Sequence, residues 1–321
     1  MSTLLVTEEH GRRFDLRVAL AFFAIYVVWG TTFLAIRIAV AEVPPLLAAG
    51  ARFFLAGAAL FGFMRWRGKA AITPRQWRNL LVLALLMFVA EYGPLFWAEK
   101  YVPSGIASVL EATLPIITLI FEAVVLRQQR FRWTLAVSTL VGLGGVAVLI
   151  LPGGRGAVPA LPSLAILAGA VAWCLGSVLS RSFDLPRSRP VTAGAMMMLG
   201  GAVLLALSAL FGEWSPLPHL SLRAGLALVY LIAFGSLIAF TAYVWLLGRM
   251  PATQVSSHAY VNPIVAVAAG YIFAGEPLTP RTLVGTALVI ASVFFILRPS
   301  SVPEKAPGRA EARLATDASD A

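Results

Sequence analysis

The chain has 321 residues, of which 59% are hydrophobic and only 12% are charged, with a mean hydropathy of +0.85. A soluble domain is roughly half apolar and about a quarter charged, so this composition excludes an ordinary soluble domain and indicates a membrane protein. The net charge of +10 does not indicate nucleic-acid binding, because the basic residues lie between the apolar runs and form no stripe.

Apolar runs of about 20 residues, long enough to cross a hydrocarbon core, recur along the whole chain. They predict an all-α polytopic membrane protein whose ten transmembrane helices are 18–37, 46–65, 79–98, 104–126, 132–151, 162–181, 191–211, 223–246, 253–274 and 281–298. Residues 1–17 are predicted to form a cytoplasmic N-terminal segment. Residues 299–321, which are rich in Ala, Pro, Ser and charge, are predicted to form a disordered cytoplasmic tail.

The distribution of Lys and Arg predicts the orientation of the chain. With the N-terminus in the cytoplasm, nineteen of these residues fall in connections on the inner side and five on the outer side, and only Arg52 lies well inside a span. Cytoplasmic loops carry an excess of positive charge. Both termini are therefore predicted to be cytoplasmic, which requires an even number of spans.

The two halves of the chain, 18–151 and 162–298, resemble each other. Residues of the first half that recur in the second at matching spacing are Trp29 and Arg37 (as Trp173 and Arg181), then Trp97, Pro103 and Pro115 (as Trp245, Pro251 and Pro263). Each half has five predicted spans, an odd number, so the second half would cross the membrane in the opposite direction. Inverted repeats of this kind build transporters whose substrate site lies near the bilayer midplane.

Four motifs in this order resemble the EamA-type transporters of the drug/metabolite transporter superfamily: WGTTFLAIRIA, ARFFLAGAAL, AEKYVPSGIASVLEATLPI and HAYVNPIVAVAAGYIFAGEPLTPRTLVGTALV. The resemblance covers about residues 18–298. It implies two inverted five-helix bundles and export or exchange of small metabolites, often amino acids or drug-like compounds. One departure is Gln128, which occupies the position where many relatives carry an acidic residue like Glu276.

The fourth predicted span carries polar residues on one helical face. Ser108, Glu111 and Pro115 are spaced three and four apart, whereas the rest of the turn is apolar. An ionised carboxylate at membrane depth is costly, so this face is predicted to line the interior or a water-filled cavity. Pro115 removes a backbone hydrogen bond and is predicted to kink the helix, either to free carbonyls for a substrate or only to shape packing.

The ninth span shows the same pattern. Gln254, His258 and Asn262 recur every four residues, and Pro263 follows as a second predicted kink. The two helices are repeat mates, so their polar faces are predicted to line one cavity. A hydrogen-bonded packing role for His258 remains an alternative to binding or proton transfer.

Three ionisable residues lie at one depth, because Arg52, Glu91 and Glu111 are each roughly 10 Å inside the end of their spans. We hypothesise that Arg52 compensates charge by pairing with Glu91 or Glu111, which leaves the other carboxylate to bind a proton or a substrate ammonium. A pair that only neutralises itself inside the bundle is the alternative. Glu99, at the end of its span, is predicted to lie in the membrane interface.

Deep aromatic residues complete the predicted substrate site. Trp29, Tyr92, Tyr243 and Tyr260 lie away from the span ends where Trp and Tyr usually gather. They can contact a ligand by stacking or by cation–π attraction. A wall of this kind predicts a small amphipathic substrate.

The sequence therefore predicts a secondary transporter of small amphipathic metabolites, amino acids or related compounds. Export by alternating access is favoured and proton coupling is left open. A passive facilitator or channel and a non-transporting membrane sensor are the alternatives. An enzyme is not predicted, because HExxH, a supported Ser/His/Asp set and a Walker A loop are absent from the sequence. With one cysteine, Cys174, no disulfide pair, metal site or cofactor is predicted.

The predicted partners are the substrate and the lipid bilayer, with no nucleic acid. The predicted location is a bacterial inner membrane. Whether the protein is a monomer or a homodimer is left open, because glycines in spans five and ten suit contacts within one chain as well as between chains.

Overall fold

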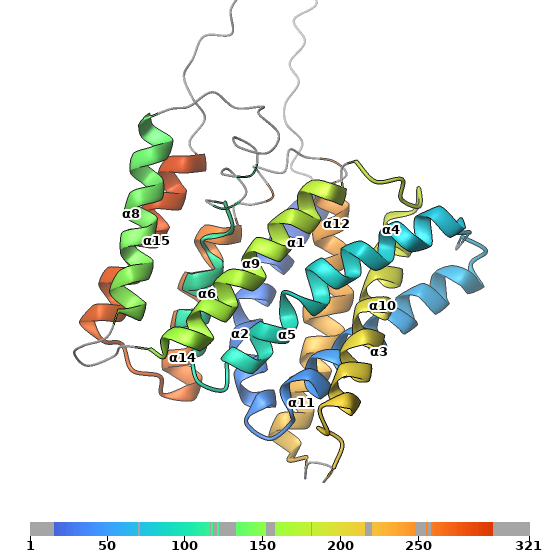
Figure 1. Cartoon of the computed structure of the whole chain (residues 1–321), viewed down its shortest axis with the longest axis horizontal. Helices are drawn as coiled ribbons and strands as arrows, with labels where there is room; N and C mark the ends of the chain where they lie inside the picture. The colour runs from blue at the N-terminus through green and yellow to red at the C-terminus, as the bar shows by residue number, and fades with distance from the viewer. Residues whose placement is uncertain are drawn as a thin grey trace, which may run out of the picture.

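The computed structural model describes residues 16–69, 71–115, 117, 121, 133–151, 158–180, 182–215, 220–247, 249, 255 and 258–297. The predicted tail and most of the predicted N-terminal segment lie outside these residues. Within them every regular element is helical, as the sequence predicts (Figure 1). The elements up to residue 150 are α1 (Leu16–Phe23), π-helical η1 (Ala24–Val28), α2 (Trp29–Val40), α3 (Pro45–Trp66), α4 (Pro74–Ala84), π-helical η2 (Leu85–Val89), α5 (Tyr92–Ala98), α6 (Ser104–Glu111) and α8 (Trp133–Ile150).

The remaining elements are α9 (Ala160–Ser180), α10 (Arg189–Leu210), α11 (Leu222–Tyr230), π-helical η3 (Leu231–Phe240), α12 (Thr241–Leu247), α14 (His258–Ala274) and α15 (Pro280–Leu297). Several of them begin with local signals. In α4, for example, Thr73 and Gln76 cap each other's backbone N–H groups, and Pro74 occupies the first turn, where its missing N–H costs nothing.

Six helical runs among the described residues are long and apolar enough to cross a membrane: Leu16–Val40, Pro45–Trp66, Pro74–Ala98, Ala160–Ser180, Arg189–Leu210 and Leu222–Leu246. Two shorter apolar helices, Leu140–Ile150 and Val261–Ala274, accompany them. The all-helical, membrane-spanning class is thus confirmed. The total of ten spans stays a prediction.

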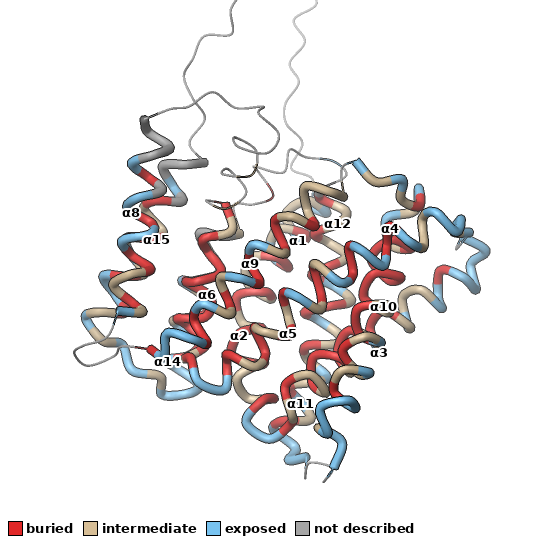
Figure 2. The backbone as a smooth tube through the Cα atoms, in the orientation of Figure 1, coloured by how far each residue is buried: buried red, intermediate tan, exposed pale blue. Residues whose placement is uncertain are grey.

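The helices pack as two extensive pairs around a group of central helices. α3 packs along α10, and α8 packs along α15 at one edge of the molecule (Figure 1). α14 contacts both α2 and α6, and α5 contacts α9, so the central helices come from both halves of the chain. Buried residues follow the facing sides, whereas exposed residues lie on the periphery (Figure 2). Large apolar side chains such as Leu164 and Phe273 are exposed there, as a lipid-facing surface requires.

Glycines let α3 and α10 approach backbone to backbone. A Cβ atom on Gly57 would lie 2.2 Å from the amide nitrogen of Met198, and one on Gly201 would lie 2.2 Å from that of Phe54. No side chain larger than hydrogen fits at such distances. Two further glycines make the same kind of contact. A Cβ atom on Gly50 would lie 2.8 Å from the amide nitrogen of Leu205, and one on Gly194 would lie 2.8 Å from that of Phe61.

The third long span is interrupted at Glu91. In η2 the N–H of Ala90 donates to the carbonyl of Leu85, five residues back, at 2.8 Å. Pro94 has no N–H, so the carbonyl of Ala90 lacks the donor that a continuous α-helix would supply. The helix therefore breaks between η2 and α5, and Glu91 lies at the break.

A second interruption follows Glu111, the last residue of α6. Pro115 lies four residues further on and cannot donate to the Glu111 carbonyl. The chain instead tightens into a turn, in which the N–H of Thr113 donates to the carbonyl of Leu110 at 3.1 Å. Both membrane carboxyl groups thus lie where a proline prevents a continuous helix. Pro263, by contrast, lies inside α14, which continues through it.

The N-terminus of α6 is held by a residue from the other half of the chain. The Glu276 carboxylate, between α14 and α15, accepts hydrogen bonds from the N–H groups of Ser104 (2.8 Å) and Gly105 (3.1 Å). A carboxylate at this end of a helix satisfies free donors and complements the helix dipole. Gln128, its predicted counterpart, lies outside the described residues.

Candidate functional site

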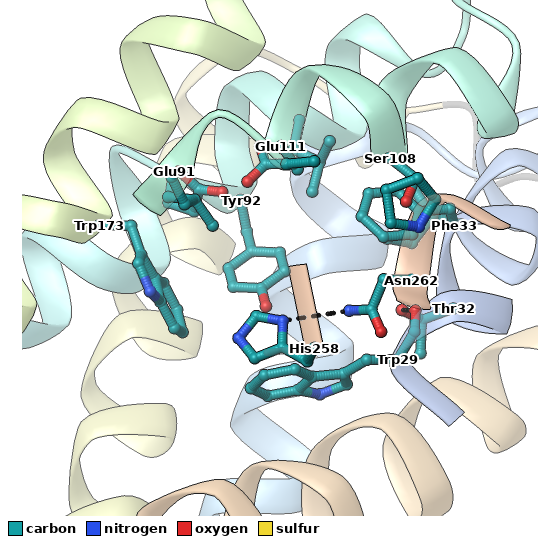
Figure 3. Close-up of a pocket in the computed structure, with 15 residues that line it drawn as sticks. Trp29, Thr32, Phe33, Glu91, Tyr92, Ser108, Glu111, Trp173, His258 and Asn262 are labelled. Carbon is teal, nitrogen blue, oxygen red and sulfur yellow. Dashed lines mark hydrogen bonds between the residues drawn. The ribbon is translucent and has the colours of Figure 1, made fainter. Parts of the chain in front are cut away.

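A cavity of about 620 Å³, including its open side, lies among α2, α5, α6, α9 and α14 (Figure 3). The lining residues are Trp29, Thr32, Phe33 and Ile36 of α2, Glu91, Tyr92 and Leu95 around the start of α5, Ser108, Glu111, Ala112 and Leu114 in and after α6, Trp173 of α9, and His258, Asn262 and Pro263 of α14.

Glu91 and Glu111 form a carboxyl pair in the wall of the cavity. They are only 3% and 8% exposed, and they lie on the same side of the cavity (Figure 3). Two carboxyl groups can share a hydrogen bond only when one of them carries a proton, because an ionised carboxylate has no donor. Glu91 Oε2 and Glu111 Oε1 have no hydrogen-bond partner, and neither does the nearby buried hydroxyl of Ser108. The wall therefore presents several acceptors that lack donors.

Gly169 of α9 makes room for the Glu91 carboxyl group. A Cβ atom at this position would lie 2.8 Å from Glu91 Oε2 and 3.1 Å from the Glu91 carbonyl oxygen. The absence of a side chain at Gly169 thus helps to set where this carboxyl group points.

Aromatic rings form much of the remaining wall. The Trp29 ring lies 5.1 Å from that of Tyr243 and 5.3 Å from that of His258, measured between centroids. The Trp29 indole N–H also donates to the Gly235 carbonyl in η3 at 3.1 Å, which fixes its orientation. Trp173 lies 6.1 Å from Tyr92 and continues the aromatic wall towards the carboxyl pair.

Asn262 connects the two halves of the chain beside the cavity. Its amide lies 3.4 Å from His258 Nδ1 (Figure 3). With the amide turned over, its nitrogen would donate to the carbonyls of Ile25 and Tyr26, each at 2.9 Å. These carbonyls belong to π-helical η1, whose altered hydrogen bonding leaves acceptors for a neighbouring helix.

Arg52 does not pair with either carboxyl group, contrary to the sequence hypothesis. It is 1% exposed, its Nε donates to Ser236 Oγ at 2.9 Å, and its Nη1 has no partner. The guanidinium carbon lies 4.6 Å from the Phe53 ring centroid and 5.3 Å from that of Tyr92. The side chain extends from α3 to η3 and is not among the residues that line the cavity, so cation–π contacts take the place of the expected ion pair.

Glu99 lies inside the protein, although the sequence placed it in the membrane interface. It is 0% exposed, and neither carboxylate oxygen has a hydrogen-bond partner. Its backbone carbonyl accepts a hydrogen bond from Arg37, whose guanidinium also donates to the carbonyl of Val102. Glu99 is not part of the cavity lining.

Of the predicted site residues, the cavity brings together Trp29, Glu91, Tyr92, Ser108, Glu111, His258, Asn262 and Pro263. Tyr243 packs behind Trp29, and Pro115 acts on the backbone after Glu111. Gln254 and the side chain of Tyr260 lie outside the described residues. Sequence reasoning missed Trp173, Thr32 and Phe33 as lining residues. Trp173 was recognisable as the repeat mate of Trp29, whereas Thr32 and Phe33 carry no distinguishing signal.

Within the described part of the chain, no group of three His, Cys, Asp or Glu side chains could hold a metal ion.

Comparison with protein families gives two consecutive matches. The profile described as the EamA-like transporter family matches residues 16–151 and again residues 161–298. The chain belongs to this family. It is accordingly a membrane protein of a transporter family, which is not a family of enzymes.

Related proteins carry transporter names. The "Uncharacterized inner membrane transporter YedA" of Escherichia coli K12 is 36% identical over 280 residues, covering 86% of this chain and 89% of that protein. The "Probable amino-acid metabolite efflux pump" of Salmonella typhimurium is 28% identical over 279 residues, covering 84% and 91%. A solved crystal structure, 24% identical, aligns with a TM-score of 0.63 over 88% of this chain and 97% of that one, which supports the fold alone.

Proposed function

We propose that the protein is a secondary transporter that exports small amphipathic metabolites, amino acids or related compounds, from the cytoplasm by alternating access with proton coupling. The observation that carries the proposal is the cavity, whose wall is built by helices from both family-matched segments and contains a buried carboxyl pair. The direction and the amino-acid class follow the name of the Salmonella relative.

The contact between α3 and α10 supports two inverted repeats. Gly57 and Gly201 are equivalent under the offset that relates Trp29 to Trp173, and each contacts the equivalent part of the other helix. The contact moves from Leu205 back to Met198 as α3 advances from Gly50 to Gly57, so the two equivalent helices run antiparallel. A two-fold axis that relates antiparallel spans lies in the plane of the membrane, as in inverted-repeat transporters.

A cavity shared by two such halves suits alternating access. α2, α5 and α6 supply one part of the wall and α9 and α14 the other. Movement of one half relative to the other would change which side of the membrane reaches the cavity, while the lining residues stay with their helices. The excess of Lys and Arg in one set of connections supports cytoplasmic termini on both ends of the chain.

The pair Glu91 and Glu111 supports proton coupling. A proton shared by the two groups would lie in the wall of the cavity, where a bound substrate would compete with it. Release of that proton on one side and recovery on the other would couple substrate movement to a proton gradient.

Uptake of a labelled panel of amino acids and related amines into everted membrane vesicles tests the proposal, with and without a proton gradient and against vesicles lacking the protein. We expect gradient-dependent uptake that Glu111→Gln abolishes and Glu99→Gln preserves, since Glu99 is an equally buried acid outside the cavity. Uptake at the same rate with and without the proton gradient would indicate a passive facilitator. Binding to the purified protein without any uptake would indicate a sensor and refute transport.

A further inference from the structure

The charge of the cavity is one-sided. Among the residues that the structure describes, its lining contains two carboxyl groups, Glu91 and Glu111, and neither Lys nor Arg. Arg52 is not among the lining residues, and its guanidinium is directed to Ser236 and to aromatic rings. A ligand that brings a positive charge is therefore matched, whereas a ligand that brings a negative charge meets no opposite charge in the wall.

The free acceptors in the wall suit an ammonium group. Glu91 Oε2, Glu111 Oε1 and Ser108 Oγ are buried, line the same cavity and have no partner. An ammonium carries three donors and no acceptor, so it can satisfy several such atoms at once. Buried acceptors that are left unsatisfied are costly, which makes this a site built to receive a donor.

The opposite part of the cavity suits an aromatic or other apolar body. Figure 3 shows the two carboxyl groups on one side of the cavity and the rings of Trp29 and His258 on the other, with Tyr92 between them. Trp173 and Phe33 add further aromatic surface. Rings of this kind attract a cation through their faces and bury an apolar skeleton.

A free α-carboxylate fits this wall badly. In an amino acid the carboxylate carbon lies two bonds from the ammonium nitrogen. An ammonium bound at the pair would therefore bring the carboxylate close to Glu91 and Glu111. Asn262 and Thr32 offer only neutral polar groups. Like charges in a low-dielectric site repel strongly.

We propose that the cavity selects protonated amines with an aromatic or apolar body and no carboxylate over the corresponding amino acids. An ammonium and a proton compete for the same two carboxyl groups, so a proton that the pair holds is released when the amine binds. This inference rests on the proposed function for its physiological meaning. Within the proposed class of small amphipathic metabolites, it favours amines related to amino acids over the amino acids themselves. The other titratable or charged groups around the pair are Tyr92, Tyr243, His258, Arg52 and Glu99.

Three probes that share one aromatic body separate the possibilities: 2-phenylethylamine, phenylalanine and phenylalaninamide, the last of which keeps the ammonium but has a neutral amide. Binding to the purified full chain in detergent is measured by calorimetry, with proton release followed in weak buffer. We expect both carboxylate-free amines to bind at least about tenfold more tightly than phenylalanine, since one unpaired charge in a desolvated site is worth more than about 1.4 kcal/mol. We also expect close to one proton released.

Variants link the binding to the pair. Glu111→Gln and Glu91→Gln should each weaken amine binding by more than about tenfold and suppress proton release. Glu99→Gln, the matched change at a buried acid outside the cavity, should alter neither. Binding of phenylalanine that equals or exceeds that of the amines would overturn the inference, and so would an absence of binding by all three probes.

Counterflow in proteoliposomes distinguishes this inference from the proposed function. If phenylalanine is transported and the amines are not, amine selectivity fails and the transporter stands. If the amines bind with proton release but nothing crosses the bilayer, transport fails and the amine site stands.

Discussion

Gly169 of α9 lies against Glu91, so that a Cβ atom on the glycine would come within 2.8 Å of the carboxyl oxygen Oε2. A contact this short obliges the carboxyl group to move. We expect Gly169→Ala to leave the protein folded, because the shortest contact is with the end of a flexible side chain and the backbone atoms of Glu91, at 3.1 and 3.2 Å, need to shift by only a few tenths of an ångström. The displaced carboxyl group should weaken ligand binding by about tenfold or more. Calorimetry on the purified variant measures this.

Gly144→Ala is the matched control, since a Cβ atom at Gly144 of α8 meets nothing within 4 Å. Equal effects of the two substitutions would show that Gly169 has no special relation to Glu91.

The contact between α3 and α10 predicts a second set of effects. Gly57→Ala and Gly201→Ala should each lower the free energy of unfolding by about 1–3 kcal/mol, because the added methyl group meets backbone atoms that cannot move aside. Gly62→Ala, on the same helix α3 but with open space around it, should be neutral or stabilising. Unfolding in mixed micelles provides the measurement, and an innocuous Gly57→Ala would contradict the backbone contact.

The guanidinium of Arg52 is buried, so replacing Arg52 by an apolar side chain of similar volume is expected to raise the free energy of unfolding. Its position is equivalent to Met196 in the second half. We expect Arg52→Met to be more stable by about 1–4 kcal/mol, because the desolvation cost of an unpaired charge exceeds what cation–π contacts return. Arg52→Ala should lose stability, since it leaves a cavity. Destabilisation by both substitutions in thermal unfolding would show that the charge itself stabilises the fold.

At the connection between α2 and α3, Glu42 accepts hydrogen bonds from Ser221, from Oγ at 2.7 Å and from the backbone N–H at 2.8 Å. These bonds, with a smaller contribution from the charge of Arg223, hold the pKa of Glu42 below its ordinary value. Their contribution to stability is therefore present above the unfolded pKa and is lost as the pH falls through the lowered folded pKa.

Removal of the Ser221 hydroxyl group tests whether its hydrogen bond lowers the pKa of Glu42. Ser221→Ala should raise the pKa of Glu42, and Arg223→Gln should raise it by less, because the hydroxyl bond is the largest cause. Carbon-13 NMR titration of the carboxyl signal, assigned with Glu42→Gln, measures both. The reverse ranking would contradict the hydrogen-bond explanation.

Much of the fold was predictable because runs of about 20 apolar residues admit few structures other than membrane helices. The interruptions at Glu91 and Glu111 were less accessible. Pro115 indicated the second one, but π-helical η2 has no comparable sequence signal. An added residue in a helical turn rotates every following side chain, so periodicity alone could not say which neighbours Glu91 would meet.

The same limit explains the cavity lining. Glu91 and Glu111 were predicted to face the interior because carboxyl groups avoid lipid. Their position on the same side of the cavity, rather than beside Arg52, depends on the relative rotation of three helices. Thr32 and Phe33 lie on α2, a largely apolar helix with little amphipathic periodicity, so no periodic pattern distinguishes the face that lines the cavity. Glu99 was misplaced because nearness to a span end was taken for exposure.

The interruption at Glu91 also has a mechanical meaning. η2 and α5, on either side of this residue, lack a continuous backbone hydrogen-bond ladder between them, which makes the break a natural hinge. Bending at this hinge would move Glu91 relative to Glu111 on α6. A ligand held between the two carboxyl groups would therefore resist such bending.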